Sequence, residues 1–477
     1  MMKRFFRGAM VLLPCLFCIS RATIFYVHPD SSLNSIQVAL DLCATGDTVL
    51  VAPGIYRESI TWPYIQGVQL LSESGADTTI IDGGGNGSVI HLSLMAGDSA
   101  TVIQGFTIRS GNAWLGGGIY CVGGRPLITG NIITGNVADW PIDCMVPLLD
   151  CRTGPPPQGG GIYTEWSSAV ITDNIISNNN ALQNGGGIAC FCDAANISPL
   201  ILNNMITGNT AHNGGGLYID CPFTLTEVRE NMISGNAAIC GGGVACYYAF
   251  MPLLKIVRNL ITGNVADSAG GGIWCYLASS PLIDSCTITG NTGDGIYSGY
   301  FSSPIVSWND ITDNLGFGIR NDDPTYPVIA ENNWWGDASG PYHPTTNPGG
   351  TGDTVSDYVD FEPWLTMPGV SASTAQSRPA SVLKIYPNPV VNSVWIRYSI
   401  SEVVNSRPNA VVSMKIYDSA GRLVKSLEPV SSGENQESSV YWNGTDCLGR
   451  TLPSGVYLVK FETEHYTETE KIVLLRQ

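Results

Sequence analysis

A six-residue motif recurs along the middle of the chain, and its spacing limits what the chain can fold into. Residues 131–136 read Asn-Ile-Ile-Thr-Gly-Asn, and six close variants follow. The final Asn of each copy lies at 136, 179, 209, 236, 264, 291 and 314, so the steps are 43, 30, 27, 28, 27 and 23 residues. Three glycines and an apolar residue recur at 116–119, 159–162, 185–188, 214–217, 241–244 and 270–273. A repeat of 20–50 residues indicates a solenoid or a propeller.

The length of the apolar runs decides between these two architectures. Each repeat holds three short runs, such as 119–121, 127–128 and 132–133. A propeller blade needs four longer strands over about 40–45 residues, whereas three short strands fit one coil of a parallel β-helix. Neighbouring coils would then stack at about 4.8 Å. We therefore predict an all-β chain that contains a parallel β-helix solenoid.

Stacked coils place equivalent residues directly above one another. The predicted interior column consists of Ile133, Ile176, Ile206, Ile233, Ile261, Ile288 and Ile311. Branched aliphatic side chains pack well in such a column. Asn136 and its equivalents are expected to form a ladder at a turn, where each amide can bond its neighbour and the backbone. The glycine triplets allow the chain to turn where a Cβ atom would clash.

The strand after each glycine triplet alternates between the two sides of the coil. Ile119 and Cys121 are predicted to point inward and Tyr120 outward. The position of Cys121 is small or apolar in every coil, and it reads Cys121, Thr164, Cys190, Ile219, Cys246, Cys275 and Ser298. We interpret these cysteines first as buried small hydrophobic side chains. Disulfides between Cys246 and Cys275, or between Cys144 and Cys151, remain open alternatives.

The outward positions of this strand are rich in aromatic residues, which are candidate ligand contacts. The candidates are Tyr120, Tyr163, Tyr218, Trp274, Tyr276 and Tyr297. Flat rings suit stacking against the apolar C–H face of a sugar. The alternative interpretation is that the rings support each other between coils, or that they pack against a long loop such as 137–158.

Glu165 and Asp220 are the only carboxylates in those outward columns and are candidates for catalysis. They are predicted to lie two coils apart, so about 10 Å between backbones. Inverting glycosidases hold their carboxyl groups about 6.5–9.5 Å apart, so such a pair is compatible with hydrolysis. The alternative is two solvated acids. The twelve cysteines outside the N-terminal segment follow no zinc spacing, so no metal site or cofactor is predicted, although calcium is compatible with the acidic surface.

The N-terminal segment 1–22 reads as a secretory signal, with a basic start, an apolar stretch and small residues before the cleavage point. Removing it takes away four basic residues and no acidic ones, so the net charge falls from −17 to about −21. This charge argues against nucleic acid and anionic membranes as partners. No segment is long and apolar enough for a transmembrane span.

Residues 32–43 show apolar residues at helical spacing and are expected to form a short helix that covers the N-terminal end of the solenoid. The stretches 46–49, 53–56 and 80–83 follow, and Asn-Asn-Trp-Trp-Gly at 332–336 marks the far end. Over residues 24–366 the chain resembles the pectin-lyase-like superfamily of right-handed β-helices. The resemblance implies the fold, which hosts lyases, hydrolases and adhesins alike.

Residues 367–381 are rich in Ser, Ala and Pro and are interpreted as a linker. Beyond them, alternating strands separated by Gly, Asn and Asp turns predict a small β-sandwich. Tyr-Pro-Asn-Pro at 386–389, Trp-Asn-Gly-Thr-Asp at 442–446 and Ser-Gly-Val-Tyr at 454–457 resemble an Ig-like type IX secretion sorting domain over 382–477. The resemblance implies that this domain engages the export machinery.

The predicted organisation is therefore a signal at 1–22, a β-helix at 23–366, a linker at 367–381 and a sorting domain at 382–477. The favoured function is an exported or cell-surface protein that binds polysaccharide or mediates adhesion without catalysis. The first alternative is a polysaccharide lyase or glycoside hydrolase with a divergent site. The second is a structural spacer without a ligand.

Overall fold

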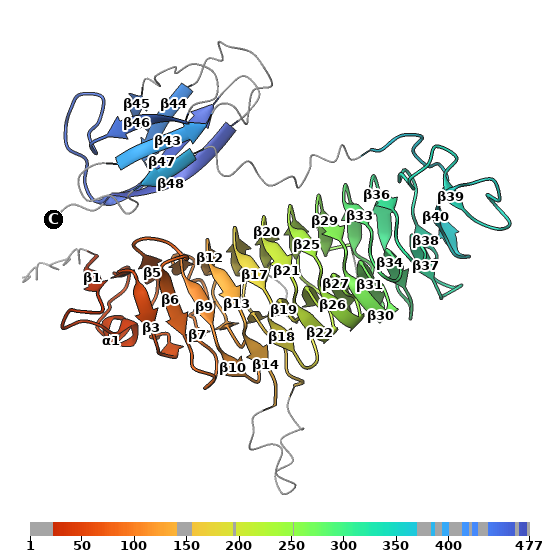
Figure 1. The fold of residues 1–477 in the computed structure, drawn as a ribbon, viewed down its shortest axis with the longest axis horizontal. Helices are drawn as coiled ribbons and strands as arrows, with labels where there is room; N and C mark the ends of the chain where they lie inside the picture. Colours follow the sequence, from red (N-terminus) through yellow and green to blue (C-terminus); the bar gives the residue numbers. More distant parts are fainter. Residues whose placement is uncertain are drawn as a thin grey trace, which may run out of the picture.

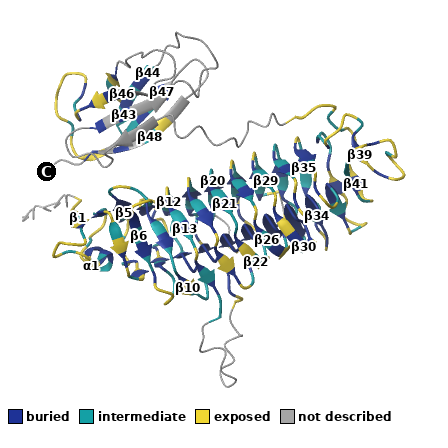
Figure 2. Cartoon of the chain, viewed as in Figure 1, coloured by how far each residue is buried: buried dark blue, intermediate teal, exposed yellow. Residues whose placement is uncertain are grey.

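The computed structural model describes residues 22–140, 155–193, 197–250 and 252–369, and towards the C-terminus residues 383–386, 394–399, 413–418, 422–427, 437–462 and 467–474. The described residues between 22 and 369 form a solenoid in which parallel strands stack into long sheets (Figure 1). Exposed residues appear mainly at the turns between strands (Figure 2). The predicted parallel β-helix is thus confirmed.

Three long sheets, which we call A, B and C, run the length of the solenoid. Sheet A consists of β1 (Ile24–Val27), β2 (Thr48–Val51), β5 (Gln69–Ser72), β8 (Val102–Gln104), β12 (Leu127–Thr129), β16 (Val170–Thr172), β20 (Leu200–Leu202), β24 (Glu227–Arg229), β28 (Lys255–Val257), β32 (Leu282–Asp284), β35 (Ile305–Ser307), β38 (Val328–Ile329) and β41 (Val359–Asp360). Sheet B consists of β3 (Gly54–Tyr56), β6 (Thr79–Asp82), β9 (Thr107–Arg109), β13 (Ile132–Thr134), β17 (Ile175–Ser177), β21 (Met205–Thr207), β25 (Met232–Ser234), β29 (Leu260–Thr262), β33 (Thr287–Thr289) and β36 (Asp310–Thr312). Sheet C consists of β4 (Ile60–Thr61), β7 (Ile90–Ser93), β11 (Ile119–Val122), β15 (Ile162–Glu165), β19 (Ile188–Phe191), β23 (Leu217–Asp220), β27 (Val244–Tyr247), β31 (Ile273–Tyr276), β34 (Ile296–Ser298) and β37 (Ile319–Asn321).

A shorter sheet D was not predicted from the three apolar runs of each repeat. It consists of β10 (Asn112–Ala113), β14 (Val137–Ala138), β18 (Asn180–Ala181), β22 (Thr210–Asn213), β26 (Ala237–Cys240) and β30 (Val265–Ala269). The side chains that its strands bury are all small, namely Ala138, Ala181, Ala238, Ala266 and Ala269. Such strands leave no apolar run in the sequence, so the fourth side of the coil has no signal there.

The interior columns follow the predicted register. Ile206 pairs with Ile233 and Ile233 with Ile261 on consecutive strands of sheet B, and all three are fully buried. Cys121, Cys190, Cys246 and Cys275 also point inward and are buried free thiols. Cys246 and Cys275 pair in register without a disulfide, so they behave as small hydrophobic side chains. Cys144 and Cys151 lie outside the described residues.

The predicted ladder at Asn136 is confirmed by its hydrogen bonds. The Nδ2 of Asn136 donates to Oδ1 of Asn179 at 3.0 Å, and the Nδ2 of Asn179 donates to Oδ1 of Asn209 at 3.0 Å. Each amide also donates to a carbonyl of an adjacent coil, as from Asn179 to the Ile133 oxygen at 2.9 Å. The Oδ1 and Nδ2 atoms of each buried Asn in the ladder therefore have hydrogen-bond partners, as buried polar groups require.

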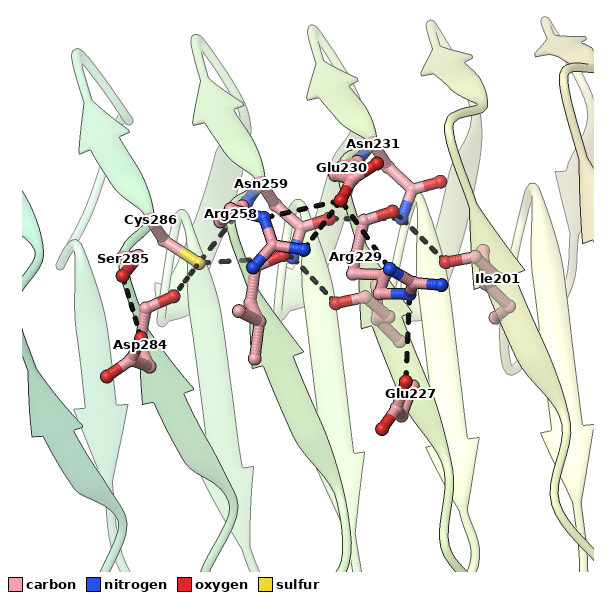
Figure 3. A network of polar contacts seen from close by, with 12 residues as sticks. Ile201, Glu227, Arg229, Glu230, Asn231, Arg258, Asn259, Asp284, Ser285 and Cys286 are labelled. Atoms are coloured by element: carbon pink, nitrogen blue, oxygen red, sulfur yellow. Dashed lines mark hydrogen bonds and ion pairs between the residues drawn. The ribbon is translucent and has the colours of Figure 1, made fainter. Parts of the chain in front are cut away.

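The first Asn of the motif forms a second ladder that the sequence interpretation missed. It includes Asn131, Asn174, Asn204, Asn231 and Asn259, with Nδ2–Oδ1 distances of 3.0–3.1 Å. Figure 3 shows the part of this ladder at Asn231 and Asn259 beside surface ion pairs, of which Arg258 Nη2 to Glu230 Oε1 at 2.6 Å is the shortest. Cys286 interrupts it, because its sulfur takes the place of the amide.

Replacing Cys286 by Asn is expected to stabilise the solenoid by about 1 kcal/mol. The sulfur is a weak acceptor for Asn259 N at 3.4 Å, and burial raises the pKa of the Cys286 thiol to about 12. The introduced amide would instead accept from Asn259 and donate to Asn309, as in the other coils. Urea unfolding of the full chain measures the change. Cys286→Ala removes the sulfur without adding an amide, so it should lower stability; a gain with Ala would contradict the explanation.

Both ends of the solenoid are covered. α1 (Ile36–Asp41) begins after Ser35, whose Oγ accepts from Val38 N at 3.2 Å, and it buries Ile36, Ala39 and Leu40 against the core. The predicted N-terminal cap is thus confirmed. At the other end lies a two-stranded sheet of β39 (Pro341–Tyr342) and β40 (Gly352–Thr354), and Trp335 is fully buried there.

The C-terminal part forms two antiparallel sheets around a core of its own. One contains β42 (Leu383–Tyr386), β43 (Val394–Ser399) and β46 (Glu437–Trp442), and the other contains β45 (Leu423–Leu427), β44 (Ser413–Asp418), β47 (Gly455–Glu462) and β48 (Thr467–Leu474). Ile416, Trp442 and Phe461 are among its buried residues. This arrangement fits the predicted small β-sandwich.

Two predicted segments fall largely outside the described residues. These are the signal, of which only residue 22 is described, and the linker, of which 367–369 are described. Among the helices of the described part of the chain, none has the length and apolar character needed to cross a membrane.

Candidate glycan-binding face

The outward side chains of sheet C form the candidate site. The first column consists of residues that pair in register on successive strands of sheet C. They are Tyr120, Tyr163, Ala189, Tyr218, Ala245, Trp274 and Tyr297. The second column, two residues further along each strand, contains Glu165, Phe191, Asp220, Tyr247 and Tyr276. The structure therefore brings all six predicted aromatic residues and both predicted carboxylates to one side of the solenoid.

The first column lies outside the coil but is largely covered. Tyr163, Tyr218 and Trp274 are only 2%, 6% and 8% exposed, whereas Tyr120 and Tyr297 are half-buried. These rings pack with Ala189 and Ala245 of neighbouring coils and with Cys240 and Ala269 of sheet D. The alternation of side chains along a strand shows which residues point outward from sheet C. It does not show that sheet D lies beside this outward side and covers it. The covered rings therefore support the face rather than form its outer surface.

The accessible rings lie in the second column and in the turns that follow it. Tyr247 lies 6.5 Å from Tyr276, and Tyr276 lies 5.2 Å from Tyr300, with interplanar angles of 26° and 18°. The series continues from Tyr300 to Phe301 at 4.8 Å and from Phe301 to Tyr326 at 5.6 Å. We call these five residues the aromatic run. Tyr300 and Phe301 are 51% and 49% exposed, because they follow the end of β34 in the turn towards sheet A.

Carboxylates border the rings. Glu165 Oε2 accepts a hydrogen bond from the Tyr120 hydroxyl at 3.2 Å. Asp220 lies two strands away with Phe191 between them, as predicted. Partial burial, with a smaller contribution from the Asp193 charge, raises the pKa of Asp220 to about 6. Burial raises the pKa of Tyr163 as well, and the charges of Glu165 and Asp220 add to this effect.

A cleft of about 580 Å³ lies at the start of the face, beside Tyr120. Its lining includes Trp114, Tyr120, Asp139 and Trp140, and the two indole rings are 5.2 Å apart. The Nε1 of Trp114 donates to the Pro155 carbonyl at 2.5 Å. Asp139, Trp140 and Pro155, from the described ends of the 137–158 segment, thus line part of the cleft. Trp114 and Trp140 were missed, although they stand 26 residues apart, close to one repeat.

Cations are scarce on this face. Arg320 lies over the Tyr297 ring at 5.6 Å, and its Nε and Nη2 donate to the two carboxylate oxygens of Asp322 at 2.9 and 3.0 Å. Within the described residues, no three His, Cys, Asp or Glu side chains are grouped as metal ligands would be. The rings of this face can stack on a ligand, and its carboxylates can accept hydrogen bonds.

A stack of parallel coils with an aromatic outer side defines a solenoid protein that presents one long face to its surroundings. Comparison with family models agrees with this fold, because residues 66–278 and 237–339 match the right handed beta helix region. Residues 384–475 match the secretion system C-terminal sorting domain. The chain belongs to the right-handed β-helix family. Its sorting domain marks it for type IX secretion to the cell surface or the extracellular space.

Solved structures show more distant similarity, and a search of curated proteins found no match. XylC in complex with xylose is 10% identical, with 94% of this chain and 100% of that chain covered and a TM-score of 0.42. The tailspike gp49 from Acinetobacter baumannii bacteriophage Fri1, a capsular polysaccharide depolymerase, is 10% identical, with coverage of 96% and 78% and a TM-score of 0.37. Latent PorU from Porphyromonas gingivalis is 28% identical over 20% of this chain, which spans 9% of PorU, with a TM-score of 0.16.

Proposed function

We propose that the protein binds polysaccharide on the outer face of sheet C after its export, and that this binding serves attachment at the cell surface. The observation that supports this most strongly is the aromatic run, and a cleft that Trp114, Tyr120 and Trp140 line adds a second set of rings. Aromatic rings stack on the C–H faces of sugars. The carboxylates of Glu165 and Asp139 beside them can accept hydrogen bonds from sugar hydroxyls.

The cleft gives the sharpest test of this proposal. Trp114→Ala combined with Trp140→Ala is expected to weaken glycan binding by tenfold or more, because two stacking rings contribute about 1 kcal/mol each. A glycan array probed with the full chain identifies the ligand, and calorimetry then measures Kd for both proteins. Trp308→Ala is the control, because Trp308 is 50% exposed at the turn between sheets A and B. Equal weakening by the control would contradict the assignment of the cleft.

A second candidate function is glycoside hydrolysis by Asp220 and Glu165, and the raised pKa of Asp220 favours it. A carboxyl group that stays protonated near pH 6 can donate a proton to a leaving oxygen, while a second carboxylate activates water. Release of new reducing ends from a bound glycan, lost in both Asp220→Asn and Glu165→Gln, would support this function. Bound glycan that stays intact with the wild-type chain would exclude it.

The pKa of Asp220 also predicts a pH-dependent effect on stability. A carboxyl group with a raised pKa in the folded state costs stability when it is ionised, so the cost is absent below about pH 4 and complete above about pH 6. Asp220→Asn should therefore stabilise the chain by about 1–2 kcal/mol at pH 7.5 and have little effect at pH 4. Thermal unfolding at both values checks this. Asp267→Asn, at an exposed carboxylate on β30, is the control. An equal gain in stability of Asp220→Asn at pH 4 and pH 7.5 would contradict the explanation.

A further inference from the structure

The rings of the aromatic run are regularly spaced, and the proposed function does not say which class of polysaccharide they bind. Tyr247, Tyr276 and Tyr300 belong to successive coils, and their rings face each other at small angles. Neighbouring strands of a sheet stand about 4.8 Å apart, so the run from Tyr247 to Tyr326, which spans four coils, measures about 14 Å along the solenoid. A ligand that contacts all of it must be elongated and must lie parallel to the solenoid axis.

The charges along the face point to the nature of this ligand. We consider the strands of sheet C from β11 onward together with the turns that follow them, at 119–126, 162–169, 188–199, 217–226, 244–254, 273–281, 296–304 and 319–327. Their acidic residues are Glu165, Asp193, Asp220, Asp322 and Asp323. Their basic residues are Arg125 and Arg320, and Arg320 is neutralised by its two hydrogen bonds to Asp322.

Several of these carboxylates already act as acceptors beside the rings. Asp323 Oδ2 accepts from the Phe301 backbone N at 2.9 Å, and Asp322 Oδ2 accepts from the Tyr297 hydroxyl at 3.1 Å. Trp166 Nε1 donates to Asp193 Oδ1 at 2.6 Å. With five acidic and two basic residues, these strands and turns carry a net charge of −3, so an approaching anionic chain would meet a net negative face.

We propose that the aromatic run binds an extended, uncharged polysaccharide whose chain lies along the solenoid axis; this rests on the proposed function and names its ligand class. The C–H faces of successive sugars stack on Tyr276, Tyr300 and Phe301. Sugar hydroxyl groups donate to the carboxylates that border the rings, and such bonds are strengthened by the negative charge. Uronates, sulfated glycans and phosphate-containing glycans are repelled by the same carboxylates. About three sugar units are needed to cover the run.

The test uses the full chain and oligosaccharides of equal length. Xylohexaose, cellohexaose and mannohexaose are the neutral probes, and hexamers of mannuronate and galacturonate are the anionic ones. Calorimetry is expected to show binding of a neutral hexamer and none of the anionic hexamers. Tyr300→Ala and Phe301→Ala should each weaken it by about tenfold. Trp308→Ala is a matched control, because Trp308 is also half-exposed and also lies at a positive φ of 59°. The affinity of the Trp308→Ala variant for the neutral hexamer should stay within about twofold of wild type.

Other results separate this inference from the proposed function. If an anionic hexamer binds more tightly than every neutral one and Tyr276→Ala abolishes that binding, the ligand class is wrong and the binding face stands. If a neutral hexamer binds and Tyr300→Ala behaves like Trp308→Ala, the aromatic run is not its site. If the chain binds neither these hexamers nor any glycan on an array, both proposals fall. Affinity for a neutral hexamer should also stay constant between about 0.05 and 0.5 M NaCl, since no charge pairs are formed.

Discussion

Replacing Gly216 by Val is expected to prevent the solenoid from folding. A Cβ atom at this position would lie 2.6 Å from the Gly243 carbonyl oxygen of the next coil and 3.1 Å from the Ile233 methyl group. The Gly243 oxygen accepts the hydrogen bond from Leu217 N at 2.9 Å, so the added atom would push apart two coils that are bonded there. Overpacking against backbone cannot be relieved by a rotamer change, and we expect a loss of more than about 4 kcal/mol.

The yield of exported protein and urea unfolding of the purified chain measure this effect. Gly216→Ala adds the same Cβ without the branches, so it should fold with reduced stability and keep the prediction testable if the Val variant cannot be purified. Gly263→Asn is the matched control: Gly263 has a φ of +62°, which Asn tolerates, and nothing lies within 4 Å of its added Cβ. Unfolding of Gly216→Ala at the wild-type urea concentration would show that the coils are not packed this closely.

Asn179→Ala is the second substitution with a large expected effect. The Nδ2 of Asn179 donates to Ile133 O at 2.9 Å and to Asn209 Oδ1 at 3.0 Å, and its Oδ1 accepts from the backbone N and the Nδ2 of Asn136 at 3.0 Å each. Truncation removes four hydrogen bonds. The backbone N of Asn136 loses its acceptor, whereas Asn209 Oδ1 keeps the bond from Asn179 N at 3.0 Å and Asn136 Nδ2 keeps the bond to Ile108 O at 3.1 Å. Each buried polar group that loses its partner costs about 1–3 kcal/mol, so we expect a total of about 3–5 kcal/mol.

The adjacent residue supplies the control for this substitution. Asn180 is exposed on β18 and donates one side-chain hydrogen bond, to Thr210 Oγ1 at 2.8 Å. Asn180→Ala should change stability by less than about 0.5 kcal/mol. Denaturant unfolding of the two variants under the same conditions compares them directly. If both cost the same, the ladder contributes no more than a surface hydrogen bond does.

The fold could be predicted from the sequence because the coils stack in register, so the same residue type is required at the same position of every coil. The isoleucine column at Ile206 and Ile233 and the small column at Cys246 each recur at the same offset, so one register satisfies all coils. The second ladder could have been found as well, since Asn131 opens the same motif that Asn136 closes. Sheet D was missed because its strands bury only small side chains, such as Ala138, Ala181 and Ala238, and therefore contain no apolar run.

The candidate site was predicted less completely, for a physical reason. Strand alternation identifies which side of the coil a ring occupies, but exposure depends on what lies beside the sheet. Tyr163, Tyr218 and Trp274 point outward and are nevertheless covered, partly by residues of sheet D. Tyr300 and Phe301 lie in a turn beyond the strand, where period-two alternation no longer applies. Tertiary neighbours, rather than the strand pattern, decide which rings can contact a ligand.

A crystal structure of the full chain with a bound oligosaccharide tests the central claim most directly. Sugar rings are expected to stack on Tyr276, Tyr300 and Phe301, or to lie against Trp114 and Trp140 in the cleft, with hydroxyl groups directed at the neighbouring carboxylates. A glycan that lies against sheet A or sheet B, with the outer face of sheet C left uncovered, would contradict it.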